Sequence, residues 1–505
     1  MGFPTLLARA VLDQSERRSH KSAERTTVDP TMLARWQFAT TTVYHFLIVP
    51  LSIGLTALVA VMQTLAYRKR GTAAGEQWDR SARFWGRIML ILFALGVVTG
   101  IVQEFQFGMN WSQYSRFVGD IFGAPLAMEA LIAFFIESTF LGLWIFGRDL
   151  LGPKLHCATI WMVAAGTTIS AYFILAANSF MQHPVGLKYD AEQKRVELTS
   201  IWKVLTNSTQ LVTFPHTILA AFMTASALLV SISAWHLRKD KDAADPAHKG
   251  VLKIGLGVLI VSAIGVSLVG HVQGQIMTDQ QPMKMAAAEA LWDTEKNADF
   301  SLFAYANLDE GHGNRGKNSF NVSIPSGLSI LATNHPSGTV KGINDVATAE
   351  AKAHGGSPAA YIPVVWLAYW SFRLMIGLGV LAALLAIFLA IQWRRGKLTS
   401  SDKLLRVSVW TVTLPLLANS FGWLFTETAR QPWLVYGWLT TKDGVSTNVG
   451  AGFVFTTLVL FTALYGVLGV ICFRLVRHYA MLGPADTTPP EPGAAATDEP
   501  VMSLV

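Results

Sequence analysis

The segment LPLLANSFGWLFTETARQPW, residues 414–433, is apolar enough to cross a bilayer, yet it carries Asn419, Glu427 and Arg430 into the end of that crossing. An ionisable side chain inside a membrane is costly and usually marks a functional site. In the alternative interpretation, Glu427 lies just past the end of a helix and is simply hydrated. The rest of the sequence must decide between the two interpretations.

The composition is that of an integral membrane protein. Of the 505 residues, 51% are hydrophobic and only 14% are charged; the mean hydropathy is +0.38, and soluble domains usually carry about 25% charged residues. The isoelectric point near 9.3 does not indicate a nucleic-acid partner, because the basic residues lie in short clusters between apolar segments. Cys157 and Cys472 are far apart in the chain, so neither a disulfide framework nor a thiolate metal site is expected.

Apolar segments predict an all-α fold with nine transmembrane helices, since each is long enough to cross about 30 Å of hydrocarbon. They begin near Trp36, Phe84, Pro125, Cys157, Gln210, Val251, Pro363, Leu404 and Val449. Basic clusters at residues 68–87, 238–253 and 394–406 follow the first, fifth and seventh segments. By the positive-inside rule these connections are cytoplasmic, which predicts an outer N-terminus and a cytoplasmic C-terminus.

Five parts are predicted along the chain. Residues 33–276 hold the first six helices and residues 362–478 the last three. Between them, residues 277–361 form a polar, Gly-rich extracytoplasmic loop, and a loop of this length is usually functional or disordered. Residues 1–32 are expected to be a disordered extension without a signal peptide, with Met32 as a candidate start. Residues 479–505 are expected to be a disordered cytoplasmic tail.

Polar side chains recur at a similar depth toward the outer side of six predicted helices, as judged from a rise of 1.5 Å per residue. Chance would scatter such residues, so their joint position indicates a site more strongly than any one of them does. Glu129 is expected just inside the outer start of the third helix. The full set is His45, Glu104, Glu129, His216, Arg373, Met375 and Glu427.

A histidine and a methionine from facing helices form a known axial pair for a six-coordinate haem. Taken singly, His45 is more often a hydrogen-bonded packing residue, and Met375 is more often core filler. A histidine or carboxylate without a strong partner opposite leaves an iron five-coordinate and able to take oxygen. The set therefore fits several haems. Only His45 and His216 are placed clearly within helices, which excludes a haem-copper oxidase subunit, since that class needs many membrane histidines.

With these residues located, the sequence closely resembles subunit I of the cytochrome bd quinol oxidases over residues 33 to about 477, with a quinol loop of the shorter type. Three motifs carry the resemblance: RWQFATTTVYHFLIVPLSIG at 35–54, GIVQEFQFGMNWSQYSRFVGDIFGAPLAMEALIAFFIESTFLGLWIFG at 100–147 and WSFRLMIG at 370–377. The opening segment supplies a fourth, because ETARQPW at 427–433 is similar to the family's GRQPW signature. Ala429 replaces the usual glycine.

The resemblance implies one low-spin haem b and two high-spin haems, one haem b and one haem d. His216 and Met375 would be the axial ligands of the low-spin haem b, with Arg373 compensating propionate or haem charge. His45 would hold haem d and Glu427 the high-spin haem b, although family members exchange these two positions.

Four further residues are implied near the cofactors. Glu129 would lie opposite His45 as a distal ligand or proton donor. Arg430 would help to offset the cost of burying the Glu427 carboxylate. Trp423 and Glu104 are additional cofactor-binding candidates.

The resemblance also implies a proton route from the cytoplasm. Glu137 lies two turns from Glu129, rotated by about 80° on a 3.6-residue repeat, so both can line one side of the third helix. Asn178 and Ser138 would complete this route.

Lys284 and Glu289 match the quinol-binding lysine and acidic residue of the family's outer loop. They lie in MKMAAAEALWDTE at 283–295. A lysine can hold the quinol oxygen, and a carboxylate can take its proton. In the alternative interpretation the two form an ordinary solvated pair on a helix.

The expected reaction is the oxidation of two quinols at the outer face and the reduction of dioxygen to two waters. Protons taken from the cytoplasm would separate charge without a pump. The expected partner in the bacterial cell membrane is a second membrane subunit, subunit II, together with candidate small accessory subunits. Two alternatives stay open: a haem-b-only, cyanide-insensitive oxidase of the same superfamily, and a non-redox transporter that uses these charges for ion coupling.

Overall fold

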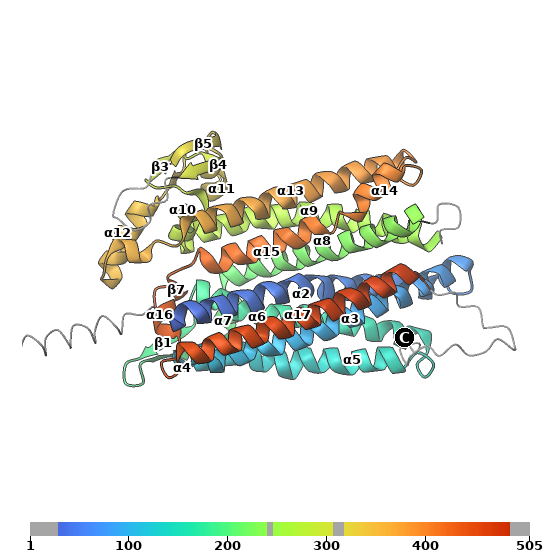
Figure 1. Ribbon diagram of the computed structural model, residues 1–505, viewed down its shortest axis with the longest axis horizontal. Helices are drawn as coiled ribbons and strands as arrows, with labels where there is room; N and C mark the ends of the chain where they lie inside the picture. Colours follow the sequence, from blue (N-terminus) through green and yellow to red (C-terminus); the bar gives the residue numbers. More distant parts are fainter. Residues whose placement is uncertain (1–28, 240–245, 307–317, 485–505) are drawn as a thin grey trace, which may run out of the picture.

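Long helices packed side by side form the body of the protein in the computed structural model, which describes residues 29–239, 246–306 and 318–484 (Figure 1). Within these residues, nine helical spans are long and apolar enough to cross a membrane, which confirms the predicted number. The spans are Pro30–Arg68, Ala73–Met109, Ser112–Phe146, Pro153–Gln182, Ser208–Lys239, Pro246–Gln280, Pro358–Arg394, Asp402–Thr428 and Ala451–Leu482. Most of the predicted N-terminal extension and C-terminal tail lies outside the described residues.

Six of these spans are single helices, whereas the third, seventh and eighth are divided. The single helices are α2 (Pro30–Arg68), α3 (Ala73–Met109), α6 (Pro153–Gln182), α8 (Ser208–Lys239), α9 (Pro246–Gln280) and α17 (Ala451–Leu482). The divided spans contain α4 (Ser112–Met128), η1 (Glu129–Phe134) and α5 (Phe135–Phe146); η2 (Pro358–Tyr361) and α13 (Val365–Arg394); and α14 (Asp402–Val409) and α15 (Thr413–Thr428).

Three helix boundaries differ from the predicted parts of the chain. Helix α2 begins at Pro30 because Asp29 caps it, accepting a hydrogen bond from the Thr31 amide, and a proline suits the first turn. Helix α9 continues to Gln280, and α17 continues to Leu482. These helices therefore extend a few residues into segments predicted as extension, loop and tail.

The third span begins much earlier than its apolar segment suggested, at Ser112 rather than near Pro125. Residues 112–124 look too polar for a membrane helix, yet Tyr114, Val118 and Ile121 are buried at helical spacing and pack into the core. Burial of this stripe extends the helix outward. The expectation that Glu129 lies just inside the start of the span is therefore wrong, because 17 helical residues precede it.

The third span also contains a π-helical turn, η1, which begins at Glu129 itself. Such turns insert extra backbone into an α-helix and are frequent at functional sites. A π-helical residue turns the chain by less than the 100° of an α-helical residue. The predicted rotation of 80° between Glu129 and Glu137 is therefore too large, and the two side chains lie closer to one face.

Short elements at one end of the bundle form a cap, at the left of Figure 1. Most belong to the segment between α9 and α13: α10 (Pro282–Glu289), β3 (Glu295–Lys296), β4 (Phe300–Ala306), β5 (Asn318–Ile324), α11 (Gly327–Thr333), β6 (Thr339–Val340) and α12 (Ile343–His354). Strand β4 pairs with β5 and β3 with β6, all antiparallel. The other cap elements are β1 (Leu187–Asp190), β2 (Arg195–Leu198), α7 (Ile201–Leu205), β7 (Trp433–Val435), β8 (Leu439–Thr440) and α16 (Thr441–Gly444).

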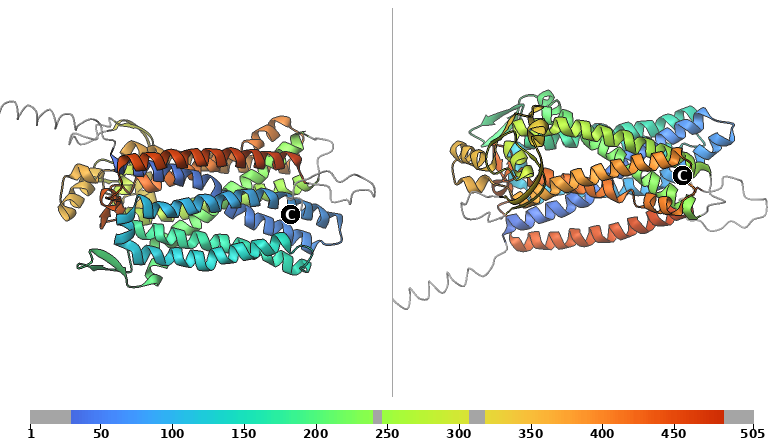
Figure 2. Two further views of the ribbon diagram at one scale, coloured as in Figure 1. Left: turned by 60° about the horizontal axis from the view of Figure 1, so that its bottom comes forward. Right: turned by 90° about the horizontal axis from the view of Figure 1, so that it is seen from above.

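Helix α2 lies at the centre of the bundle, in contact with α3, α6, α8, α15 and α17. The views of Figure 2 agree that α17 runs beside it. Its residue Gly54 allows α8 to come close, since a Cβ there would lie 2.5 Å from that of Ala225. This close packing fixes the side of α2 that carries His45.

Buried histidines also tie helices together at the end of the bundle opposite the cap. His156 Nε2 donates to the Trp144 carbonyl at 2.8 Å, and its Nδ1 accepts from the Gln63 side chain at 2.7 Å. His236 and His248 stack with ring centroids 4.2 Å apart. More histidines lie within helices than the two expected from the sequence, and His156 serves packing.

Candidate functional site

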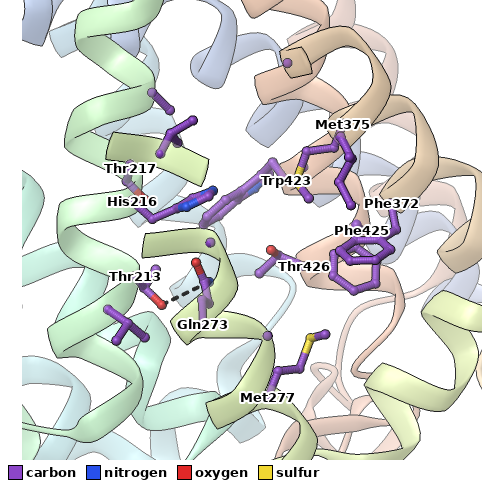
Figure 3. Close-up of a pocket in the computed structure, with 18 of the residues that line it drawn as sticks. Thr213, His216, Thr217, Gln273, Met277, Phe372, Met375, Trp423, Phe425 and Thr426 are labelled. Atoms are coloured by element: carbon purple, nitrogen blue, oxygen red, sulfur yellow. Dashed lines mark hydrogen bonds between the residues drawn. The ribbon is translucent and has the colours of Figure 1, made fainter. Parts of the chain in front are cut away.

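A cavity of about 390 Å³ opens among α8, α9, α13 and α15 (Figure 3). Its lining is mostly apolar, with a few polar groups directed inward, as is usual for cofactor pockets. His216 and Met375 both line it, and so do Trp423 and Lys284. The structure thus brings together four residues that are far apart in the sequence.

His216 projects from α8 into this cavity (Figure 3). Gly270 of α9 makes room for its ring, since a Cβ there would lie 3.2 Å from the His216 Cε1 atom. The Nδ1 atom is buried and makes no hydrogen bond to a described residue. An imidazole at the wall of an apolar cavity suits a side chain that serves a bound group.

Met375 enters the same cavity from α13, and a second glycine makes room for it. A Cβ on Gly422 of α15 would lie only 2.9 Å from the Met375 Sδ atom. Trp423, the next residue, stacks on Phe46 with ring centroids 4.2 Å apart, and its buried indole N–H has no partner among the described residues. Imidazole and thioether on separate helices around one apolar cavity are a donor set that fits a haem held from both faces.

His45 lies outside this cavity, on α2, and its tautomer follows from its neighbours. Its Nδ1 atom lies 2.7 Å from the Thr99 hydroxyl, and that hydroxyl donates its own hydrogen to the Leu95 carbonyl at 2.9 Å. While that hydroxyl donates to Leu95, it accepts from a protonated Nδ1, and in this tautomer the lone pair is on Nε2. A neutral imidazole fixed in this way is a prepared metal ligand.

Glu129 of η1 and Glu137 of α5 both face helix α6, and each contacts a different residue of that helix. The Glu129 Oε1 atom accepts from Ser170 at 2.6 Å, whereas Oε2 is buried without a described partner. Glu137 is 6% exposed and packs against Gly166, and its carboxylate makes no hydrogen bond to a described residue. The Glu129 carboxylate interacts electrostatically with those of Glu104 and Glu137. The Glu129 carboxylate therefore lies near enough to the other two to be affected by their charge.

Glu104 and Ser138, two other predicted site residues, are exposed on the surface of this chain. The Ser138 hydroxyl bonds only to the Phe135 carbonyl of its own helix, at 3.4 Å. The described residues do not enclose Ser138 in a route with Glu137.

Glu427 is not hydrated at a helix end, so that alternative interpretation of the opening segment is wrong. Its Oε2 atom accepts two hydrogen bonds from Arg430, from Nε at 3.0 Å and from Nη2 at 2.5 Å, and its Oε1 atom accepts from the Asn178 side chain at 3.0 Å. Arg430 also donates to the Leu434 carbonyl at 2.5 Å. Three of the roughly four acceptor positions of the carboxylate are filled, and one on Oε1 remains.

Asn178 corrects a second expectation, because the structure brings it to Glu427 and not to Glu137 and Ser138. It lies four residues from the cap end of α6. Gly166, which contacts Glu137, is 12 residues away on the same helix, or roughly 18 Å at 1.5 Å per residue. The sequence showed that Asn178 lies within a membrane helix but not which neighbour it meets.

Lys284 and Glu289 are buried on helix α10, so the alternative of a solvated pair is wrong. They are 4% and 3% exposed. Burial lowers the pKa of Lys284 to about 7, although the nearby Glu427 favours the ammonium. Burial also raises the pKa of Glu289 to about 7, against the opposing effect of Arg373. Both groups can therefore exchange protons near neutral pH.

Arg373 faces Glu289 and does not line the cavity that holds Met375. Its Nη2 atom lies 2.5 Å from Glu289 Oε2, and its guanidinium stacks over the rings of Phe300 and Tyr369 at 4.5 and 4.6 Å. The buried Nε and Nη1 donors have no described partner. Two residues along a helix turn the side chain by about 200°, which explains why Arg373 and Met375 point apart.

Sequence reasoning missed residues that support the expected ligands. Thr99 fixes His45, Ser170 bonds Glu129, and Gln182 bonds Lys284 through Oε1 at 2.7 Å. Each is a polar residue within or at the end of an apolar helix, and that signal was available in the sequence. Gly270 and Gly422, which make room for His216 and Met375, give no such signal in the sequence, because their role depends on which helices pack together.

The described residues form nine membrane-length helices, and a cavity among four of them is lined by histidine and methionine, which is the arrangement of a haem-binding membrane protein. A family model described as cytochrome bd terminal oxidase subunit I matches residues 33–484. The chain belongs to this family of haem-containing bacterial membrane proteins, whose subunit I is part of a membrane oxidase complex with subunit II.

Known relatives agree with this assignment. The chain is 45% identical to cytochrome bd ubiquinol oxidase subunit 1 of Bacillus subtilis (strain 168), over 88% of this chain and 93% of that protein. It is 34% identical to cytochrome bd-II ubiquinol oxidase subunit 1 of Escherichia coli (strain K12), over 90% and 96%. The solved bd oxidase from Geobacillus thermodenitrificans superposes with a TM-score of 0.79 at 29% identity, over 90% of this chain and 99% of that chain.

Replacing Thr99 with valine should weaken the site at His45 while preserving side-chain shape. The variant loses the acceptor for Nδ1–H, so the imidazole is no longer fixed with its lone pair on Nε2. Removing such a supporting group typically costs about 10 to 100-fold in metal affinity or activity. Haem content and the absorbance spectrum of the purified complex measure the effect.

The control for this variant is Thr56→Val, because the buried Thr56 hydroxyl bonds only to the Ser52 carbonyl of its own helix. Thr99→Ser, which keeps the hydroxyl, should restore the spectrum. Equal spectra for Thr99→Val and Thr56→Val would show that Thr99 does not support a cofactor.

Proposed function

We propose that this chain is the haem-carrying subunit of a quinol oxidase that oxidises quinol at its outer face and reduces dioxygen to water. One observation carries the proposal: Lys284 lines the same cavity as His216 and Met375. A quinol held by Lys284 would therefore lie beside a haem held by the other two residues. The names of two relatives, both ubiquinol oxidases, support the same substrate class.

The cavity between α8 and α13 would hold the low-spin haem b, with His216 and Met375 as axial ligands. When bound, a haem supplies one-electron transfer and oxygen chemistry. The chain's own contribution is to hold the two ligands on separate helices and to exclude water with apolar side chains. Trp423, stacked on Phe46, would form one wall of the site.

His45 and Glu427 would hold the two high-spin haems, with haem d on His45 and haem b on Glu427. Thr99 supports the first assignment by leaving the lone pair of His45 on Nε2. Arg430 and Asn178 support the second, because they fix both carboxylate oxygens of Glu427. In the haem-b-only alternative these positions would carry no haem d, and analysis of the extracted pigment separates the two. Family membership favours either oxidase over a non-redox transporter.

Quinol oxidation would release protons at the cap, which we propose faces outward. Lys284 would hold a quinol oxygen, and Glu289 would take a proton from it. The buried Arg373 beside Glu289 would keep that carboxylate oriented. A carboxyl group whose pKa lies near 7 is suited to accept and then release a proton near neutral pH.

The protons consumed at the oxygen site would come from the cytoplasmic end, so charge would be separated without pumping. Glu137 and Glu129 would relay them along α5 and η1, and Ser138 would contribute if subunit II covers its exposed side. The absence of a hydrogen bond from Glu137 to a described residue supports a relay over a packing role. Asn178, at the cap end of α6, would serve Glu427.

Replacing Met375 with leucine should keep the fold, because the two side chains have similar volume. The variant removes one proposed axial ligand, so the low-spin haem b should become high-spin or fall in reduction potential. Redox-titrated absorbance spectra of the purified complex measure both. Met89→Leu, at a fully buried core position of α3, is the control. An unchanged low-spin spectrum and potential in Met375→Leu would contradict the ligand pair.

Replacing Lys284 or Glu289 with alanine should slow quinol-driven turnover and leave all haem spectra intact. Steady-state oxygen consumption measures the quinol KM and kcat, and an artificial donor that bypasses the quinol site should sustain normal rates. Lys352→Ala, at an exposed position of α12, is the control. Normal quinol kinetics combined with slow artificial-donor turnover would contradict the assignment.

The same two residues predict opposite pH effects. The Lys284 ammonium is present below about pH 7, so the quinol KM should rise as the pH increases through 7. The Glu289 carboxylate is ionised above about pH 7, so kcat should fall as the pH decreases through 7. Each pH dependence should disappear in the corresponding alanine variant.

Replacing Glu137 with leucine should reduce oxygen reduction by orders of magnitude while electrons still reach the haems. The change keeps size and removes the titratable group from a dry region. Rapid mixing of the reduced complex with oxygen should show a stalled reaction without proton uptake. Thr139→Val, at an exposed position of the same helix, is the control. Normal water formation and proton uptake in Glu137→Gln would rule the relay out.

A further inference from the structure

A continuous chain of hydrogen bonds connects Lys284 on α10 with Glu427 on α15, through two amide side chains at the cap end of α6. Lys284 Nζ donates to Gln182 Oε1 at 2.7 Å. Gln182 Nε2 donates to Asn178 Oδ1 at 2.7 Å, and Asn178 Nδ2 donates to Glu427 Oε1 at 3.0 Å. At the far end of the chain of bonds, Arg430 donates to Glu427 Oε2. The chain of bonds thereby connects the three helices α10, α6 and α15.

The charges at the two ends determine which way both amides point. An ammonium offers only donors and an ionised carboxylate offers only acceptors. Each amide therefore turns its oxygen toward Lys284 and its NH₂ group toward Glu427. A flipped Gln182 would set two donors against each other at Lys284. Bonds aligned in this way polarise and strengthen one another in a low-dielectric interior.

Gln182 is the acceptor that decides where the Lys284 ammonium points. A lysine side chain is long and flexible, so its head group takes the position of its strongest partner. Within the described residues, Gln182 Oε1 is the hydrogen-bond acceptor of Nζ, and the Phe425 ring lies 5.5 Å from it. Both Lys284 and Gln182 line the cavity of His216 and Met375, so the bond holds the ammonium at the edge of that cavity.

We propose that Gln182 is a positioning residue of the quinol site: it holds the Lys284 ammonium in place and, through Asn178, ties that position to Glu427. The inference rests on the proposed role of Lys284 in quinol binding. Without Gln182 the Lys284 ammonium would no longer be held at the edge of the cavity, so quinol would bind more weakly. Gln182 therefore affects quinol affinity through Lys284, without contacting quinol itself.

The test is Gln182→Leu in the purified two-subunit complex. Loss of one charge-assisted hydrogen bond should raise the quinol KM about tenfold. Turnover with an artificial donor is measured alongside, so that the loss of quinol affinity is separated from any change at the haem sites. Gln182→Glu keeps an acceptor for Nζ, so its quinol KM should remain within about threefold of the wild-type value.

Gln210→Leu is the matched control. Gln210 is also a buried glutamine between α6 and α8, but its side chain bonds Ser179 and the Tyr172 carbonyl. This variant reproduces the loss of a buried amide without touching Lys284, so its quinol KM should be unchanged. Equal KM values in Gln182→Leu and Gln210→Leu would overturn the inference.

A double-mutant cycle separates positioning from direct binding. If Gln182 acts through Lys284, Gln182→Leu should add nothing to the quinol KM once Lys284→Ala is present. Independent, additive effects would overturn the inference. A different result would contradict the proposed function: an unchanged quinol KM in Lys284→Ala, whatever the KM of Gln182→Leu.

Discussion

In a bilayer there is no water to satisfy a polar side chain, so every buried donor and acceptor needs a partner from the protein or from a bound group. This constraint orders the interior of the bundle. Where partners are complete, as in the set of Gln63, Trp144 and His156, the side chains only tie helices together. Partners are incomplete at other buried atoms, and two of these, His216 Nδ1 and Glu129 Oε2, belong to residues expected at the cofactor sites.

The two ends of the bundle differ in this respect. The set of Gln63, Trp144 and His156 lies at the end opposite the cap. At the cap end, Glu289 and Glu427 are each paired with a buried arginine, and the Lys284 ammonium is held by the Gln182 amide. A protein that moves electrons and protons needs both kinds of region. One end of the bundle holds the helices rigidly together, and the other holds groups that can still change their charge.

Much of the fold could be predicted from the sequence, because apolar segments of membrane length form transmembrane helices and the chain has nine such segments. The long cap segment and the buried histidine and methionine also follow from hydropathy and depth. The early start of α4 could not be predicted in the same way, since burial of Tyr114 and Val118 depends on which helices meet. A π-turn leaves no mark in a hydropathy profile either.

The sequence predicts most residues of the candidate site, but it does not predict which of them contact one another. The sequence predicts Met375, His216 and Lys284 as site residues, and the structure places them around one cavity. It predicts that Asn178 lies near Glu137, whereas the structure places it beside Glu427, because helix α6 carries polar groups toward both ends of the bundle. Thr99 and Gln182 went unnoticed because an uncharged polar residue stands out only beside the group it serves.

The π-helical turn at Glu129–Phe134 holds one residue more than an α-helix needs to turn through the same angle. Deleting one residue inside the turn would therefore restore a regular α-helix and leave Glu137 facing α6. Deleting one residue just beyond the turn would instead rotate everything that follows by about 100°. We therefore expect a shortened chain to be tolerated inside the turn and not in α5, so the place of a change in length decides whether the carboxylates stay aligned.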